Sequence, residues 1–246
     1  MKRIIIVGAT SGIGLEVARR YLQMGWRIGV AGRKVEALEA IRQSAPQQVC
    51  ARRIDVTDDD APHALRLLIE ETGGMDVFLL CSGIGSQNPD LLPETELQTA
   101  ATNVSGFVRM VCAAYHYFAQ QGKGHIAVIS SIAGTRGLGV APAYSATKRF
   151  QNTYIDALEQ LAYINKVNIA FTDIRPGFVD TPLLKGGSYP MLMQASRVAE
   201  EIVKAIGRRK RIIVIDWRYR LLVCLWRLIP RWLWAHLPIQ NRKRNV

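Results

Sequence analysis

The sequence predicts a single α/β domain in which a parallel sheet of seven strands carries helices on both faces. From residue 2 to about residue 215, short apolar runs alternate with amphipathic stretches of helical period. The runs contain almost no polar residues, which is typical of strands buried on both sides. Because a helix separates each strand from the next and crossovers are right-handed, the simplest topology is a doubly wound sheet.

Each expected strand is a short apolar run, rich in β-branched residues and bounded by turn-forming or charged residues. The first, Arg3–Val7, is almost entirely isoleucine and valine. The others follow in order at Arg27–Ala31, Gln48–Asp55, Asp76–Cys81, His125–Ser130, Asn168–Arg175 and Ile212–Ile215.

Between these strands, apolar residues recur every three or four positions, which predicts helices with one buried face. The expected helices are Gly12–Met24, Val35–Ser44, Ala61–Thr72, Leu97–Gln121, Ala143–Ile164 and Ser196–Gly207. No repeat or low-complexity linker interrupts the pattern, and 246 residues with 49% apolar side chains suit one domain. We expect that domain to cover residues 1–215.

Residues 216–246 are expected to form a basic, tryptophan-rich tail. Residues 208–246 hold eleven Lys and Arg side chains and one acid, so this segment carries +10 of the net charge of +12. Four of the five tryptophans lie in the tail, and Pro230 and Pro238 should divide it into short helices. On a helical wheel, Arg227 and Arg231 each fall within about 20° of Arg220.

Arginines interrupt the tail too often for it to span a bilayer. Two alternatives remain open: the tail lies in a membrane interface, or it packs against its own domain or a second subunit while its arginines reach water. Nucleic acid is not an expected partner, because the domain offers neither a stacking platform nor a basic groove.

The four cysteines are expected to be small apolar side chains in a reducing compartment. Cys50, Cys81, Cys112 and Cys224 lie far apart, with no C-x-x-C and no histidine at metal-binding spacing, so no metal site is expected. Met1-Lys2-Arg3 leads directly into the apolar run Ile4–Val7, which is too short for the core of a signal sequence, so no secretory signal is expected. We expect a cytoplasmic protein, at the inner face of a membrane if the tail binds lipid.

A glycine-rich loop joins the first strand to the first helix. Gly8 permits a tight turn, Gly12 lets the backbone approach a pyrophosphate, and Gly14 allows the helix to pack closely on the strand. The helix N-terminus adds partial positive charge, so the loop predicts a Rossmann-type dinucleotide site. Its expected contact residues are Gly8, Thr10, Ser11, Gly12, Ile13 and Gly14.

The end of the second strand favours NADP(H), with NAD(H) as the alternative. An NAD site needs an acid there for the ribose 2′-hydroxyl. This chain has Arg33 and Lys34, which suit a 2′-phosphate, although a solvated basic turn would look the same. Asp55 and Val56 end the third strand, where a carboxylate suits the adenine amino group.

A catalytic group is predicted around the start of the helix at residue 143. Tyr144 and Lys148 lie four residues apart, on one helix face. A tyrosine with a pKa near about 10 needs a nearby cation to act as an acid or base close to neutral pH. Ser131, thirteen residues before Tyr144, ends the fifth strand and could donate a hydrogen bond to a substrate oxygen.

Together these landmarks, with Asn103 and Pro176-Gly177, resemble the short-chain dehydrogenase/reductase family in order and spacing over residues 2 to about 215. The resemblance implies that Asn103 holds a water linking Lys148 to solvent, Ser131 polarises a carbonyl, Tyr144 is the acid/base, and Lys148 binds the nicotinamide ribose. It also implies homodimers or homotetramers.

By the same resemblance, the segment from Pro176 to Thr181 faces the nicotinamide, with Val179 and Thr181 on its carboxamide. Ser82 and Gly83 approach the adenosine ribose, although the family's Asn-Asn-Ala-Gly reads Leu80-Cys81-Ser82-Gly83 here, and Val7 replaces its usual threonine.

The loop Gly134–Pro142 and the segment Pro182–Met193 are expected to enclose the substrate. Their glycines allow movement and their Leu and Met side chains favour a lipophilic or bulky neutral molecule, although Arg136 could bind an anion. The expected activity is hydride exchange between NADP(H) and a carbonyl or alcohol. The alternative is a non-catalytic dinucleotide-binding sensor or membrane-associated interaction protein, which would not need Tyr144.

Overall fold

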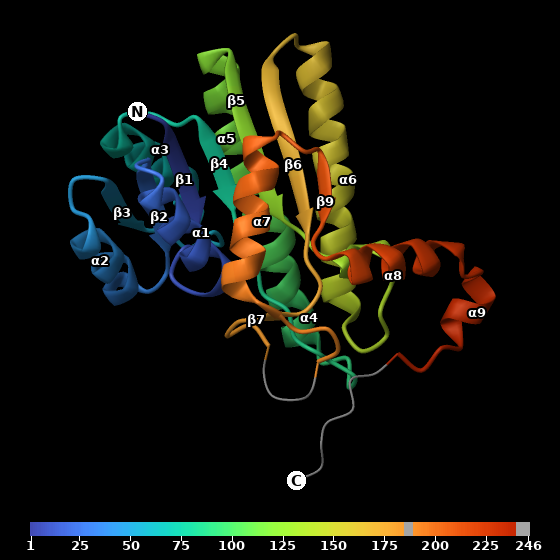
Figure 1. Ribbon diagram of the computed structural model, residues 1–246. Helices are drawn as coiled ribbons and strands as arrows, with labels where there is room; N and C mark the ends of the chain where they lie inside the picture. Colours follow the sequence, from blue (N-terminus) through green and yellow to red (C-terminus); the bar gives the residue numbers. More distant parts are fainter. Residues whose placement is uncertain (185–188, 240–246) are drawn as a thin grey trace.

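The computed structural model of the chain describes residues 1–184 and 189–239, and it confirms the doubly wound sheet (Figure 1). Over these residues, seven strands pair in parallel in the order β3-β2-β1-β4-β5-β6-β9. They are β1 Arg3–Val7, β2 Arg27–Gly32, β3 Val49–Arg53, β4 Val77–Leu80, β5 Lys123–Ile129, β6 Asn168–Arg175 and β9 Ile212–Val214. The strand order reverses between β1 and β4, which places a ligand crevice beyond their carboxyl ends.

Helices cover both faces of the sheet. Helices α1 (Gly12–Gln23), α2 (Val35–Ser44) and α7 (Ala195–Gly207) enclose one apolar core, and α3 (Ala61–Thr72), α5 (Phe107–Gln121) and α6 (Pro142–Ile164) enclose the other. Strand β1 feeds both cores alternately, since Ile4 and Ile6 face the first and Ile5 and Val7 face the second. This double burial is why its sequence is apolar throughout.

The predicted strand and helix boundaries agree with the structure to within a few residues, except for the helix expected at Leu97–Gln121. It begins earlier as α4 (Pro93–Ala100), widens into the π-helical segment η1 (Ala101–Gly106) and continues as α5. Pro93 at the first helical position favours the earlier start. The π segment carries Asn103, in keeping with the tendency of such widened turns to occur at functional sites.

Three short elements were not expected from the sequence. The 3-10 turn η2 (Ile132–Thr135) follows β5, and the two-residue strands β7 (Val179–Asp180) and β8 (Met193–Gln194) pair with each other. Strands this short leave no detectable period in a sequence. The β7–β8 pair anchors both ends of the segment expected to cover the substrate.

The C-terminal segment forms α8 (Trp217–Leu228) and α9 (Arg231–Ala235), separated at Pro230 as predicted. Both helices project sideways from the body of the molecule (red in Figure 1). Tyr219 and Val223 on α8 are buried against the domain. Across the described ranges, no helix has the length and apolar character needed to cross a bilayer.

Candidate active site

The glycine loop after β1 has the geometry of a backbone cradle. Gly8 has a φ of +92°, and a Cβ there would lie 2.6 Å from the backbone nitrogen of Ser82. A Cβ on Gly14 would lie 2.1 Å from the Gly8 carbonyl oxygen. Ser11 precedes α1 in an extended conformation and its side chain does not cap the helix. The helix N-terminus is thus open towards the crevice, as phosphate binding requires.

The remaining loop residues line the same crevice. Thr10 packs against Gly32, where a Cβ would lie 2.8 Å from the threonine methyl group. Gly12 faces Thr181, since a Cβ on this glycine would lie 3.0 Å from the Thr181 methyl group. Ile13 is partly buried against the core below. The loop and the segment after β6 therefore meet across the crevice.

Arg33 and Lys34 follow β2 and are both exposed. Asp55 lies near Arg33 and accepts hydrogen bonds from the Thr57 backbone N–H (3.0 Å) and hydroxyl (2.8 Å). Partial burial raises the pKa of the Asp55 carboxyl, but the Thr57 hydrogen bonds and the charges of Arg33 and Arg53 outweigh it and hold that pKa below its usual range. A carboxylate and a free guanidinium thus stand together where an adenosine is expected, with the buried Val56 beside them.

Asn103 joins three parts of the site. Its Oδ1 accepts the Ile84 N–H at 2.9 Å, and its Nδ2 donates to the Ile84 carbonyl at 2.7 Å and to the Thr147 hydroxyl at 3.1 Å. Gly83 lies against this group, since a Cβ there would be 3.3 Å from Asn103 Oδ1 and 3.4 Å from Lys148 Nζ. Ser82 donates its backbone N–H to Val7.

Ser131, Tyr144 and Lys148 come together beyond β5, as the sequence predicts. The Ser131 hydroxyl lies close enough to the Tyr144 hydroxyl to lower its pKa. Lys148 Nζ lies 5.7 Å from the centre of the Tyr144 ring. The ring packs on Gly85, where a Cβ would approach it to 2.4 Å. A hydroxyl donor, a phenol and an amine therefore line one end of the crevice.

Burial changes the acidity of both ionisable groups. It raises the pKa of the Tyr144 hydroxyl, and the neighbouring Ser131 hydroxyl lowers that pKa by a smaller amount. Burial lowers the pKa of Lys148 to about 8, although the negative charge of Asp173 opposes this. Lys148 therefore loses its charge much closer to neutral pH than a lysine in water does.

Gln151 also belongs to this site, although it is not among the residues predicted from the sequence. Its Oε1 accepts from Lys148 Nζ at 3.0 Å, and its Nε2 donates to the Asn103 backbone carbonyl at 2.9 Å. Lys148 also donates to the Ile129 carbonyl at 3.0 Å. Gln151 thus bridges the two groups that the family resemblance links through a water. Its only signal in the sequence is a polar residue three positions after Lys148, on a helix face that is otherwise buried.

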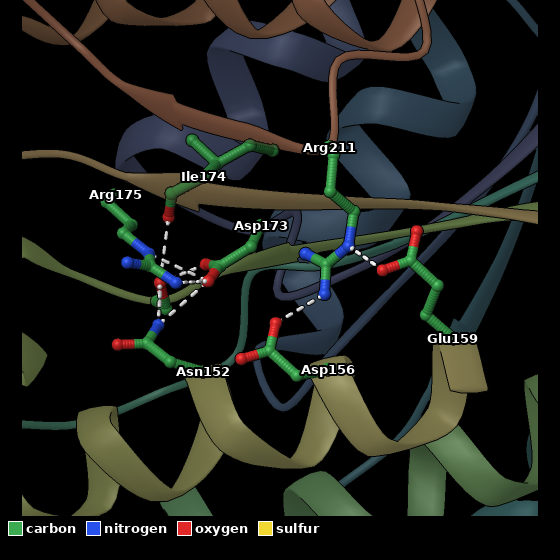
Figure 2. Close-up of polar contacts among 8 residues, drawn as sticks. Asn152, Asp156, Glu159, Asp173, Ile174, Arg175 and Arg211 are labelled. Atoms are coloured by element: carbon green, nitrogen blue, oxygen red, sulfur yellow. Dashed lines mark hydrogen bonds and ion pairs between the residues drawn. The ribbon is translucent and has the colours of Figure 1, made fainter. Parts of the chain in front are cut away.

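A second buried polar cluster lies behind the catalytic residues (Figure 2). Asp173 Oδ2 accepts from Arg175 Nε at 2.8 Å and from Asn152 at 2.9 Å, while Ser130 donates to Asp173 Oδ1. Asp173 is completely buried, so its charge acts through a poorly screened interior and reaches Lys148. Figure 2 also shows Arg211, just before β9, paired with Asp156 and Glu159 on the surface of α6.

The segment after β6 closes the crevice opposite the glycine loop. The Pro176 carbonyl accepts the Ile132 N–H at 3.1 Å. Gly177 lies beneath the Tyr219 ring, and a Cβ there would come within 2.2 Å of it. Val179 is buried, and Thr181 donates to its carbonyl at 3.3 Å. Residues 185–188 of the expected substrate cover lie outside the described residues.

The substrate side of the site departs from expectation at Arg136. This side chain donates to the carbonyls of Trp226, Arg227 and Ile229 at the end of α8 (3.1, 3.1 and 2.6 Å) and lies 5.7 Å from the Trp234 ring. Trp234 in turn donates to the Gly137 carbonyl at 2.8 Å. Arg136 therefore holds α8 and is not free to bind an anionic substrate. In the described part of the chain, no three His, Cys, Asp or Glu side chains are grouped as metal ligands.

Comparison with known proteins places these features in context. A family model described as short chain dehydrogenase matches residues 2–188. An uncharacterized oxidoreductase of Myxococcus xanthus is 31% identical over 234 residues, covering 92% of this chain and 92% of the relative. Dehydrogenase/reductase SDR family member 7B of Bos taurus is 29% identical over 237 residues, covering 86% of this chain and 72% of the relative.

Solved structures share the fold. A variant of actinorhodin polyketide ketoreductase with NADPH superposes with a TM-score of 0.76 at 25% identity, over 87% of this chain and 95% of that one. The 3-ketoacyl-(acyl-carrier-protein) reductase of Brucella melitensis, complexed with NADH, gives a TM-score of 0.78 at 22% identity over 87% and 96% of the two chains.

Proposed function

The chain belongs to the short-chain dehydrogenase family of oxidoreductases, and we propose that it is an NADP(H)-dependent enzyme that reduces a carbonyl group, or oxidises the corresponding alcohol, on a lipophilic or bulky neutral substrate. One observation carries the proposal: Ser131, Tyr144 and Lys148 meet at the open end of a crevice whose other end is a glycine cradle. A non-catalytic binding protein has no need of that arrangement.

The residues present fit a nicotinamide dinucleotide. The cradle at Gly8 and Gly14 has no room for side chains, so backbone groups line the place of the pyrophosphate. Arg33 and Lys34, exposed at the end of β2, supply positive charge where a 2′-phosphate would lie. Related structures with NADPH and with NADH leave the preference to be tested, and the basic pair favours NADP(H).

The proton chemistry follows from the three side chains. The bound nicotinamide supplies or accepts the hydride. In reduction, Ser131 donates a hydrogen bond to the substrate carbonyl oxygen and Tyr144 transfers its proton to that oxygen. The resulting Tyr144 phenolate is stabilised by the Lys148 charge and by the Ser131 hydroxyl. In oxidation the same groups act in reverse.

The apolar walls favour a neutral substrate. Met191 packs against the core and Leu192 is exposed beside it, on the segment that leads into β8. Arg136, the cation expected to reach an anion, is bound to the end of α8. It is therefore not available to a carboxylate or phosphate on the substrate.

Assembly and location complete the proposal. On α6, Phe150 and Tyr154 stack with ring centres 5.5 Å apart and are only partly buried, which suits the homodimer or homotetramer that the family resemblance implies. A cytoplasmic location fits the use of NADP(H). Sedimentation of the purified protein measures the assembly directly.

The cofactor is tested by titrating the purified protein with NADPH and NADH and following energy transfer from tryptophan to the nicotinamide. NADPH should bind at least about tenfold more tightly than NADH, because Arg33 forms charge-assisted hydrogen bonds only with the 2′-phosphate. Arg33→Ala should remove most of that difference, and Arg66→Ala, exposed on α3, should not. Equal losses for both cofactors would remove Arg33 from this role.

The acid/base is tested with Tyr144→Phe. This change removes one oxygen, so cofactor binding should stay within about twofold while turnover of ketone substrates falls by about 10²–10⁴-fold. Stopped-flow binding of NADPH and steady-state reduction rates separate the two effects. Turnover close to that of the unchanged protein would show that another group carries the proton.

A further inference from the structure

An apolar stripe runs along the outer side of α8. Trp217, Leu221, Leu225 and Leu228 are 66%, 55%, 51% and 78% exposed. Their spacing of four, four and three residues places them on one helix face, with the exposed Cys224 between them. Solvated helices in globular proteins carry polar residues on that side. Four large apolar side chains in a row therefore mark a contact surface.

The stripe cannot turn inwards, because the opposite side of α8 is fixed. The Tyr219 hydroxyl accepts the Phe178 N–H at 3.1 Å and donates to the Pro190 carbonyl at 2.9 Å. Val223 is buried one turn later. Arg136 holds the carbonyls at the far end of the helix. Both ends of α8 are thus tied to the domain with the stripe facing out.

Positive charge borders the stripe. Arg220 and Arg227 are exposed along one edge of α8, and Arg231 follows at the start of α9. Two acids lie nearby and each has a cationic partner: Asp216 is paired with Arg218 at 2.8 Å, and Glu201, which lines the same hollow as Arg220, lies 3.7 Å from Lys204. Residues 217–246 contain no Asp or Glu. On α9, Trp232 is also exposed, by 69%.

We propose that this surface, defined by Trp217, Leu221, Leu225, Leu228 and Trp232 with the flanking arginines, docks on the interface of an anionic lipid bilayer. Tryptophan and leucine enter the headgroup boundary while arginine binds lipid phosphates, and the charge of the surface is complementary to such a membrane. A second copy of the chain suits the surface less well, because a symmetric contact would bring the same arginines of both copies together.

The position of the surface connects it with the candidate active site. The end of α8 is bound to Arg136, in the loop that follows Ser131, and its start is bound to the segment after Gly177. Docking would therefore bring the substrate side of the crevice close to the lipid surface. The docking inference rests on the proposed function. It names the substrate class as lipophilic carbonyl compounds or alcohols that partition into membranes.

The test is co-flotation of the full-length protein with vesicles, without cofactor. Vesicles of equal parts phosphatidylcholine and phosphatidylglycerol should bind the protein, and phosphatidylcholine vesicles should bind it far less. Arg220→Gln with Arg227→Gln should weaken binding about thirtyfold, since each arginine near an anionic surface contributes roughly a factor of five. Leu221→Gln with Leu225→Gln should weaken it at least about tenfold, through lost apolar burial.

Tyr163→Gln with Ile164→Gln is the matched control. These side chains are 86% and 64% exposed at the end of α6 and are not part of the surface, so binding should not change. Failure to float with anionic vesicles, or flotation unaffected by the α8 changes, overturns the proposal. So does a stable dimer that the Leu221/Leu225 changes dissociate in the absence of lipid. NADPH affinity and ketone reduction are measured on the same variants, so loss of flotation with intact reduction leaves the proposed function standing.

Discussion

Gln151 and Lys148 show how burial sets the properties of single residues at this site. Lys148 is 4% exposed, and its amine donates to the Ile129 carbonyl and to Gln151. Gln151 is 1% exposed and also holds the Asn103 carbonyl. An amide fixes its partners more firmly than a mobile water but does not pass protons along a chain. We therefore expect Gln151 to be a positioning residue that orients Lys148.

Substitution at Gln151 should change the pH dependence of reduction. Because burial lowers the Lys148 pKa to about 8, kcat/KM should fall as the pH rises through that value and the stabilising charge is lost. Gln151→Glu places a negative charge beside the amine, which favours its protonated form, so the fall should move to higher pH. Gln151→Leu removes an acceptor, so the fall should move to lower pH and kcat should drop by about tenfold.

The control is Gln121→Leu, which changes a glutamine at the end of α5, where its amide donates to the Met75 and Lys123 carbonyls. The pH profile of that variant should match the unchanged protein. Profiles that coincide for Gln151→Glu and Gln151→Leu would show that Gln151 has only a packing role.

Among the elements, α8 influences the candidate site through its contacts with the segment after β6. It reaches the segment after β6 through one hydroxyl, since Tyr219 binds both Phe178 and Pro190. Burial is the main cause that raises the pKa of this tyrosine. Its ring also covers Gly177, where there is no room for a side chain. The helix thereby fixes the backbone on which the nicotinamide is expected to lie.

Tyr219→Phe tests this coupling. The ring stays, but the Phe178 N–H and the Pro190 carbonyl lose their partner, which should cost about 1–3 kcal/mol of unfolding free energy. The KM for NADPH should rise severalfold while kcat changes little, because the chemical groups are untouched. Urea unfolding and initial-rate kinetics provide the measurements. An unchanged KM together with unchanged stability would contradict the role of this hydroxyl.

At the scale of the whole molecule, the charge is divided unevenly. Residues 208–246 carry +10 of the net +12, and the remainder is almost neutral. The start of this segment completes the sheet with β9 and the first apolar core with Ile215, and Tyr219 and Val223 of α8 pack into that core as well. The start of the basic segment is therefore a structural part of the domain, and its outer side remains free for a partner.

Truncation should separate these two roles. A chain ending at Asp216 loses the buried Tyr219 and Val223, which should lower the unfolding free energy by roughly 3–6 kcal/mol. A chain ending at Ile229 keeps α8 and the carbonyls that Arg136 binds, and should lose only about 1 kcal/mol through the missing Trp234 contact. Urea midpoints of the two forms measure this. Equal stability of both would mean that α8 contributes nothing to the domain.

The sequence by itself determined the order of strands and helices, because burial on one or both faces imposes a period that can be read along the chain. It also predicted the glycine loop and the approach of Ser131 to Tyr144, since both follow from where strands end in a parallel sheet. These features depend on neighbours close in sequence or on the topology common to doubly wound sheets.

Tertiary structure alone decided the contacts between distant polar side chains and the direction in which α8 faces. Gln151 reaches Asn103 across 48 positions and Arg136 reaches Ile229 across 93, and neither pair has any shared period in the sequence. The sequence left open whether the tail packs against the domain, and the structure shows a helix α8 with one side buried and the other exposed. Such outcomes depend on which surfaces remain uncovered once the cores have formed, and no local pattern records that.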